Sequence, residues 1–380
     1  MSFTYLDNNA GAGLAEGVLD MMLPYLQQQQ GNPSSSHRFG RYAQAALDKA
    51  RQQVARLVNA DPAQVIFTSG GTEANNQAIA GVAERFESGK ILVGATEHPA
   101  MLEPAKRLQQ HGFELELIPV DENGRIDPVT LAEMIDDETR LVSVMWANNE
   151  TGVIQDIATL SAVCHEKGVP LLTDAVQAAG KLPLDIKAAG VDMLTLSAHK
   201  FGGPKGVGAL VVAPELDWPG YILGGGQEEE KRSGTENVAA IVGFGAAAEY
   251  VQSQVDNYQA HCSGLRDRLE AGLADIPGVT VFARDAERLA NTCFFALQGF
   301  DSDTMLMALD KQGFAVSSGS ACGTGRQTPS HVLTAMGVPD MIALGAVRVS
   351  VSQQNTVEQI DQLIQVLTKE AERFNHLLNR

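Results

Sequence analysis

Between about residue 60 and residue 215 of the chain, short apolar runs alternate with longer stretches in which apolar positions recur at helical spacing. Short apolar runs predict buried strands, and strands that alternate with helices predict a mostly parallel sheet covered by helices on both faces. The run 208–212 follows a glycine-rich turn and predicts one further strand, which we expect to be antiparallel. The other predicted strands are 65–68, 90–93, 114–118, 141–145, 169–172 and 193–196, and the predicted helices include 72–86, 99–111 and 156–167.

The pattern changes after residue 226. An alanine-rich helix is predicted over 237–255 and continues through 256–273. Short strands are then predicted at 278–283, 292–297 and 347–351, before a closing helix over 356–378. This order of elements predicts a smaller α+β domain that the first residues of the chain complete. We therefore predict an α/β fold with a large domain over residues 14–250 and a small domain made of residues 1–13 and 251–380.

The composition disfavours several classes of protein. The formal net charge is −18, from 28 basic and 46 acidic residues, which argues against binding to nucleic acid or an anionic membrane and favours a basic protein partner. No apolar run approaches the ~18 residues of a membrane span, and the first residues lack the basic and apolar regions of a signal peptide. The four cysteines lie far apart, with neither a Cys-x-x-Cys pair nor histidines at zinc spacing. We therefore expect a reduced, cytoplasmic protein without a metal site.

Polar residues follow five of the predicted strands, at the point where each strand ends. In an open α/β sheet, ligands bind beyond the carboxyl ends of the strands, so these residues are expected to meet on one rim. A lysine at the end of a strand is usually a solvated residue, but its expected place beside the other polar segments of the rim favours a function for Lys200. The segments are 68–73, 95–98, 146–152, 173–177 and 197–200.

The polar residues of the rim fit one cofactor, pyridoxal 5′-phosphate (PLP). Ser69-Gly-Gly-Thr72 opens a predicted helix, where backbone N–H groups favour a phosphate, although an ordinary N-cap also explains this segment. Lys200 would form a Schiff base with the PLP aldehyde, and Asp174 would keep the pyridine nitrogen protonated. His98 fits either a proton carrier stacked on the ring or a structural histidine.

Seven segments of the chain, in this order, resemble the cysteine desulfurases of the NifS/IscS-like branch. These are PLP enzymes with the class V aminotransferase fold, so the resemblance implies the type I PLP-dependent transferase fold. The resemblance extends from Tyr5 to the C-terminal helix. The segments are SGGTEANN, ATEHPA, WANNETG, LLTDAVQ, SAHKFGGPKGVGAL, GGGQEEEKRSGTENV and SSGSACGTG.

The resemblance implies a role for each matching residue of the rim. Lys200 would bind PLP and remove the substrate α-proton, while His98 would stack on the ring as an acid–base residue. Asp174 and Gln177 would contact the ring nitrogen and the ring hydroxyl. The phosphate would be bound by Gly71, Thr72, Ser197 and His199, joined by Thr235 from a second subunit, which implies a homodimer.

The resemblance also implies a substrate site. Asn149 and Arg348 would hold the substrate carboxylate, Arg348 through a bidentate fork. Cys322 would take the sulfur of L-cysteine as a persulfide, with release of L-alanine, and would deliver that sulfur to an acceptor protein. The acceptor could serve iron–sulfur cluster assembly, tRNA sulfuration or another pathway. Cys322 lies in a small, polar segment, whereas the remaining cysteines lie in helix- or strand-like contexts and are interpreted as structural: Cys164, Cys262 and Cys293.

Departures from the family pattern leave alternatives open. Gly11 and Ala12 stand where the family usually has two threonines, so contacts at the mouth of the pocket and the choice of substrate are in doubt. Arg326 and Gln327 follow the predicted cysteine in a region that would meet the acceptor. A PLP-dependent C–S lyase, selenocysteine lyase or aminotransferase would use the same fold. A non-enzymatic sulfur relay is disfavoured because the lysine, aspartate and histidine of the rim are retained.

Overall fold

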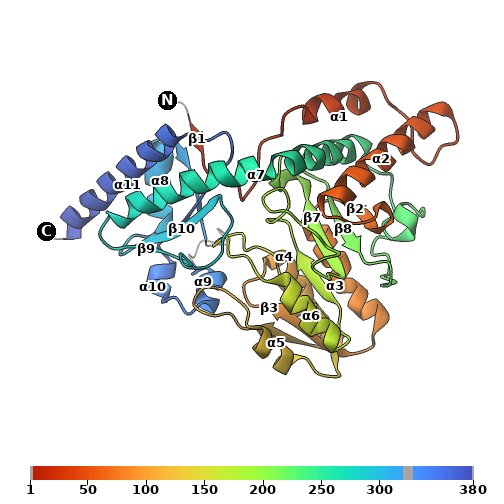
Figure 1. Cartoon of the computed structure of the whole chain (residues 1–380), viewed down its shortest axis with the longest axis horizontal. Helices are drawn as coiled ribbons and strands as arrows, with labels where there is room; N and C mark the ends of the chain where they lie inside the picture. The colour runs from red at the N-terminus through yellow and green to blue at the C-terminus, as the bar shows by residue number, and fades with distance from the viewer. Residues whose placement is uncertain (1–2, 320–327, 379–380) are drawn as a thin grey trace.

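The computed structural model describes residues 3–319 and 328–378, with side chains described up to residue 373. Within these residues, the larger sheet has seven strands in the order β2-β8-β7-β6-β5-β3-β4 (Figure 1). All pairings from β7 to β4 are parallel, and β8 is antiparallel to both β7 and β2. The predicted mostly parallel sheet and its antiparallel strand are therefore confirmed. The strands are β2 (Val65–Thr68), β3 (Gly89–Gly94), β4 (Phe113–Ile118), β5 (Thr139–Ser143), β6 (Leu171–Asp174), β7 (Met193–Ser197) and β8 (Gly208–Val212).

Two strands are displaced by two residues from their predicted positions. β6 begins at Leu171, after Pro170, since a proline has no N–H to donate to the ladder of a central strand. The strand then continues to Asp174, which is therefore the last residue of a strand and not part of the following turn. β5 ends at Ser143, although the N–H of Val144 still donates to the carbonyl of Leu172 at 3.0 Å.

The alternation of side chains along the strands separates two hydrophobic cores, one on each face of the sheet. In β2, Val65 and Phe67 belong to one core and Ile66 to the other. The first core is covered by α1 (Val18–Gln27), α2 (Arg38–Leu57), α5 (Pro128–Met134), α6 (Ile157–Glu166) and the first part of α7 (Val238–Ala274). The second is covered by α3 (Gly71–Arg85) and α4 (Pro99–Leu108). Helices thus cover both faces, as predicted.

A second, antiparallel sheet follows later in the chain, with the strand order β12-β13-β10-β9. Near it, β1 (Thr4–Tyr5) pairs in parallel with β11 (Phe314–Ala315), and Leu6 packs into the same core as Phe295 and Ile360. The first residues therefore join the C-terminal part of the molecule. Its other elements are β9 (Val279–Val281), β10 (Thr292–Leu297), α8 (Ser302–Lys311), β12 (Ser317–Ser318), α9 (His331–Ala335), α10 (Asp340–Ala343), β13 (Ala346–Ser350) and α11 (Val357–Leu378).

Helix α7 connects the two parts of the molecule (Figure 1). It is one continuous helix of 37 residues. Its residues from Ala240 to Ala248 pack in the core of the larger sheet, and those from Cys262 to Leu273 pack in the core of the smaller one. The predicted boundary at residue 250 thus falls inside a helix, and the division into two domains stays a prediction. Among the described residues, no helix is both long enough and apolar enough to cross a membrane.

Candidate active site

A cavity of about 670 Å³ lies beyond the carboxyl ends of β2, β3, β5, β6 and β7. Asn9 and Ala10, from the start of the chain, and Arg348, from β13, also line it, so both parts of the molecule contribute. Among the described residues that the sequence analysis assigned to a site, all but Thr235 lie here: Gly71, Thr72, His98, Asn149, Asp174, Gln177, Ser197, His199, Lys200 and Arg348.

Lys200 enters the cavity from a short 3₁₀ turn, Ala198–Lys200, directly after β7. Its Nζ donates to the backbone carbonyls of Asn9 (2.7 Å) and Ala10 (3.0 Å). Burial, reinforced by the positive charge of Arg348, lowers the pKa of Lys200 to about 8, against the opposing influence of Asp174 and Asp7. A lysine with a pKa near neutrality has a substantial fraction of neutral amine, which is the nucleophilic and basic form.

Asp174 occupies the end of β6 and is only 4% exposed. Its Oδ2 accepts a hydrogen bond from Asn75 Nδ2 (2.8 Å), and its Oδ1 accepts one from the backbone N–H of Val176 (2.9 Å). These neutral donors leave a buried carboxylate facing the cavity with capacity for a further, charged donor. Asn75 lies one turn into α3, inside the segment SGGTEANN, and sequence reasoning gave it no role.

The part of the cavity at the start of α3 is suited to an anion. Helix α3 begins at Gly71, and no side chain caps it, so its first N–H groups are directed to the cavity end. A Cβ on Gly71 would lie 2.8 Å from Val176 Cγ2, which explains why this position carries glycine. Ser197 Oγ and His199 Nδ1 are 2.9 Å apart. Burial, with Lys200 and Lys205 as lesser causes, lowers the pKa of His199 to about 4, so its ring is neutral at physiological pH.

His98 has a structural contact as well as a place in the cavity. It is the N-cap of α4, and its Nδ1 accepts a hydrogen bond from the backbone N–H of Ala100 (3.0 Å). The ring proton of the neutral form is therefore on Nε2. Burial lowers the pKa of His98; Lys200 and His331 act in the same direction and Asp174 opposes them. The two readings of His98, structural and functional, are compatible.

Arg348 is held by partners inside the protein. Its Nη2 donates to Asp7 Oδ1 (2.7 Å) and its Nη1 to the backbone carbonyl of Asn149 (2.8 Å). Within the described residues its buried Nε has no hydrogen-bond partner. One Nη of the guanidinium therefore engages Asp7 and the other the backbone of Asn149.

Two predicted site residues are not among those that line the cavity: one lines another cavity, and the other lies outside the residues that the structure describes. Thr235 lines a separate cavity of about 220 Å³, together with Arg232 and Glu228. Cys322 lies outside the described residues. The other cysteines are buried free thiols, and burial raises the pKa of Cys164 and of Cys262 to about 12. Thiols with such pKa values are not reactive at neutral pH.

Sequence reasoning missed three buried polar residues around the cavity. Asn9 accepts Lys200 through its carbonyl, and Lys181 donates to Asn9 Oδ1 (2.9 Å). Glu97 is fully buried, and its Oε1 accepts the N–H of Met145. Burial, with Asp174 as a second cause, raises the pKa of Glu97 well above its usual range. The sequence signals for this cluster were the polar pair Asn8-Asn9 and the place of Glu97 in the segment 95–98, and neither indicates the contacts, which join distant parts of the chain.

The buried carboxyl of Glu150 is expected to make the stability of the protein depend on pH. It is buried, and its Oε2 accepts a hydrogen bond from Ser330 Oγ. Burial raises the pKa of Glu150 from 4.5 to about 7, although Ser330 and Arg348 oppose the shift. A raised carboxyl pKa means that the native state binds the proton of Glu150 more tightly than the unfolded state does. This proton binding stabilises the native state fully at pH values below the unfolded pKa, and the stabilisation is lost as pH rises toward about 7.

We expect the melting temperature of Glu150→Gln, measured relative to that of the parent protein, to increase as pH rises from about 5 to about 8. Glutamine keeps an acceptor for Ser330 and cannot ionise. The melting temperatures of both proteins, measured across this pH range, test the point. A difference between them that stays constant with pH would show that Glu150 does not titrate in this window.

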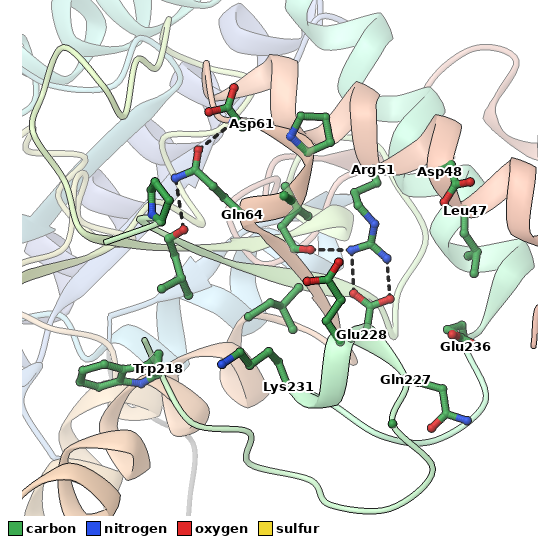
Figure 2. A pocket seen from close by; sticks show the side chains of 18 of the residues that line it. Leu47, Asp48, Arg51, Asp61, Gln64, Trp218, Gln227, Glu228, Lys231 and Glu236 are labelled. Atoms are coloured by element: carbon green, nitrogen blue, oxygen red, sulfur yellow. Dashed lines mark hydrogen bonds and ion pairs between the residues drawn. The ribbon is translucent and has the colours of Figure 1, made fainter. Parts of the chain in front are cut away.

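A larger cavity, of about 760 Å³, lies where β2 begins and β8 ends (Figure 2). Figure 2 shows Arg51 and Glu228 facing each other across two ion-pair contacts, both of 2.7 Å. Glu228 also accepts the backbone N–H of Phe67 at 2.8 Å, and Arg51 donates to the carbonyl of Val65. These are backbone groups of β2, an edge strand of the sheet. The pair therefore covers a sheet edge, and it is interpreted as structural.

Loss of this pair is expected to destabilise the protein. Glu228→Ala leaves the partly buried Arg51 without its carboxylate and exposes the edge of β2, at a cost of about 3 kcal/mol. Denaturant unfolding measures the effect. Glu229→Ala is the matched control, since Glu229 also has a left-handed backbone (φ 53°) but is exposed. Equal stability of the two variants would contradict the structural role of the pair.

Comparison with known proteins identifies the family. The family model for aminotransferase class-V matches residues 4–363. A cysteine desulfurase of Sinorhizobium fredii is 44% identical over 96% of this chain and 95% of its own length, and the cysteine desulfurase NifS of Azotobacter vinelandii is 41% identical over 96% and 91%. A solved NifS-like protein superposes with a TM-score of 0.92 at 35% identity over 97% of this chain and 99% of its own. The structure of SspA in complex with cysteine gives 0.81 at 32% identity, over 93% and 99%.

The chain therefore belongs to the class V aminotransferases and, among them, to the cysteine desulfurase family. The resemblance drawn from the seven segments is confirmed, and so is the predicted fold class. The families concerned are families of PLP enzymes. The roles of the individual site residues stay predictions.

Proposed function

We propose that this protein is a PLP-dependent cysteine desulfurase that converts L-cysteine to L-alanine and transfers the sulfur to Cys322 as a persulfide. One observation carries the proposal: a lysine with a lowered pKa, a buried aspartate and an uncapped helix N-terminus face one cavity. The names of the relatives and the cysteine complex of SspA support the same reaction.

The residues of the cavity fit PLP. Asp174 is a buried carboxylate whose described partners are neutral, and it suits a protonated ring nitrogen. The start of α3, with Thr72, Ser197 and His199, offers donors to a phosphate. When bound, PLP supplies an electron sink for the bond changes at the substrate carbon. Lys200 would hold the cofactor covalently and then carry the proton at the substrate α-carbon, while Gln177 would bind the ring hydroxyl and His98 would stack on the ring.

The substrate would enter beside Arg348. We propose that its carboxylate replaces Asp7 as the partner of the guanidinium, with the side-chain amide of Asn149 as a second donor. The thiolate of Cys322 attacks the substrate sulfur, so that an S–S bond forms as the C–S bond breaks. The carbon keeps the electron pair of the broken bond and takes up a proton, which yields L-alanine. The persulfide then passes to an acceptor protein, for which the net charge of −18 favours a basic surface. A reduced, cytoplasmic setting suits the free thiols.

The decisive experiment incubates the purified protein with L-cysteine and quantifies alanine, sulfide and protein-bound persulfide. Alanine together with persulfide on Cys322 is the expected result. Pyruvate as the main product would favour a C–S lyase. Activity on selenocysteine alone would favour a selenocysteine lyase, and a keto acid formed without sulfide would favour an aminotransferase. A colourless protein without PLP would favour a sulfur relay.

A homodimer is the proposed assembly, because Thr235 does not line the active-site cavity of its own chain but a neighbouring one, which shares Ser69 and Gly206 with it. An exposed apolar segment adjoins it: Leu223 is 80% exposed, and the backbone N–H of Ser233 donates to Ile222 (2.8 Å). We expect the protein to sediment as a dimer. Leu223→Asp should weaken the dimer and reduce PLP retention together, because a buried charge opposes association.

Met341→Asp is the matched control for this change, since Met341 is also strongly exposed (85%) but lies on α10, in the other part of the molecule. Sedimentation velocity and the PLP content of each variant provide the two measurements. A monomeric parent protein that keeps full PLP occupancy at low concentration would refute the shared site.

A further inference from the structure

Lys181 is a buried lysine that the proposed reaction does not use. It lies in the turn after β6, seven residues beyond Asp174, and is 4% exposed. Its Nζ donates to Gln177 Oε1 (2.7 Å) and to Asn9 Oδ1 (2.9 Å). Within the described residues, these side-chain contacts are with amide oxygens and not with a carboxylate. Burial, with Lys200 and Arg348 as further causes, lowers the pKa of Lys181 well below its usual range.

The two contacts of Lys181 determine which way two amide groups face. An amide side chain has an acceptor oxygen at one end and a donor nitrogen at the other, and a lysine hydrogen bond fixes the oxygen end. Gln177 must therefore turn its Nε2 away from Lys181, and one N–H of that nitrogen donates to the backbone carbonyl of Asn9 (2.9 Å). The second N–H of Gln177 remains for the cavity that this residue lines. With the opposite orientation, Gln177 would offer an acceptor there.

Lys181 also orients the side-chain amide of Asn9, and Asn9 in turn contacts Lys200. Its Oδ1 accepts both Lys181 Nζ and Asn291 Nδ2 (2.9 Å each), and its Nδ2 donates to Thr292 Oγ1 (2.9 Å). Its backbone N–H donates to Ser350 Oγ (2.9 Å). The carbonyl of this fully bonded residue is the acceptor that holds Lys200 Nζ at 2.7 Å. A change at Lys181 thus reaches the reactive amine through the carbonyl of Asn9, which also accepts a hydrogen bond from Gln177 Nε2.

We propose that Lys181 is a positioning residue, which orients the amides of Gln177 and Asn9 and thereby sets both the donor that faces the cofactor ring and the place of the Lys200 amine. The proposal rests on the proposed function, since it assumes that PLP binds in this cavity. A lysine suits the position because its amine has an N–H donor for each of the two amide oxygens in either protonation state.

The test is Lys181→Met in the full-length holoenzyme, since methionine keeps a similar length and has no donor. The control is Lys187→Met, because Lys187 is exposed (53%) and pairs with Asp61 on the surface. We expect Lys181→Met to move the midpoint of the pH titration of the visible PLP absorbance by roughly 0.5 to 1 pH unit. We also expect it to raise the rate of PLP release about tenfold and to lower kcat by about 10-fold to 100-fold, with a smaller change in KM. Lys187→Met should match the parent protein.

A double variant tests whether Lys181 acts through Gln177. In a Gln177→Leu background, Lys181→Met should shift the absorbance titration by less than about half as much, because residues that act through one another are not additive. If Lys181→Met fails to fold, Lys181→Gln, which keeps one N–H donor site, is measured in its place. A loss of melting temperature with an unchanged titration midpoint and PLP release would overturn the proposal, and so would full additivity with Gln177→Leu. A parent protein that binds no PLP would instead defeat the proposed function, and the inference with it.

Discussion

Replacement of Lys200 by alanine is expected to give a folded protein that borohydride no longer links covalently to PLP. Lys200 is the cavity lysine whose pKa is lowered to about 8, and its amine is held over the site by the carbonyls of Asn9 and Ala10. The amine is proposed both to hold PLP and to carry the α-proton. Its removal should therefore reduce alanine formation by about 10³-fold or more.

Folding should be largely retained in this variant, because the partners of Lys200 are backbone carbonyls of residues that line the cavity and can bind water instead. Lys205 provides the control, since it also lines the cavity but is exposed. Lys205→Ala should keep the borohydride adduct on the peptide that contains Lys200. An adduct mapped by mass spectrometry to Lys205 or Lys181 would overturn the assignment of Lys200.

The strands of the larger sheet could be predicted because their side chains pack in the two cores, and strands buried in this way appear in the sequence as short apolar runs. β2, β7 and β8 are buried along their whole length and consist mainly of apolar residues. β6 is buried too, but only its first two residues are apolar. Of the two displaced strands, β5 and β6, the start of β6 was misplaced because Pro170 was included in a central strand. Since the ends of parallel strands share one edge of the sheet, the correct strands also placed most of the predicted site around one cavity.

The polar network beneath the cavity could not be predicted in the same way. Its members, Asn9, Lys181 and Asn291, come from three distant parts of the chain and meet only after the smaller sheet packs against the larger one. No periodicity marks such contacts, because each residue is a single polar side chain in an otherwise ordinary segment. The engagement of Arg348 by Asp7 is of the same kind, since it joins positions 341 residues apart. Local patterns therefore identify the rim of the site, whereas the support of the rim depends on tertiary structure.

Replacement of Cys322 by serine is expected to separate cofactor chemistry from sulfur transfer. Lys200, Asp174 and the start of α3 do not depend on a thiol at position 322, so the variant should bind PLP as the parent protein does. L-Cysteine should still change its visible absorbance. Release of alanine and sulfide should nevertheless fall by orders of magnitude, because a serine hydroxyl is a poor nucleophile toward divalent sulfur.

The remaining cysteines serve as internal controls for this experiment. Cys164, Cys262 and Cys293 are buried, and burial raises the pKa of each thiol above its ordinary value. Replacing any one of them by serine should cost stability through a buried, poorly bonded hydroxyl while sulfur transfer to Cys322 continues in the folded fraction. The readout is the persulfide mass increase on the peptide that carries Cys322, measured beside alanine. Near-normal alanine release by Cys322→Ser would mean that the C–S bond breaks without this thiol, and a lyase reaction would then replace the persulfide mechanism.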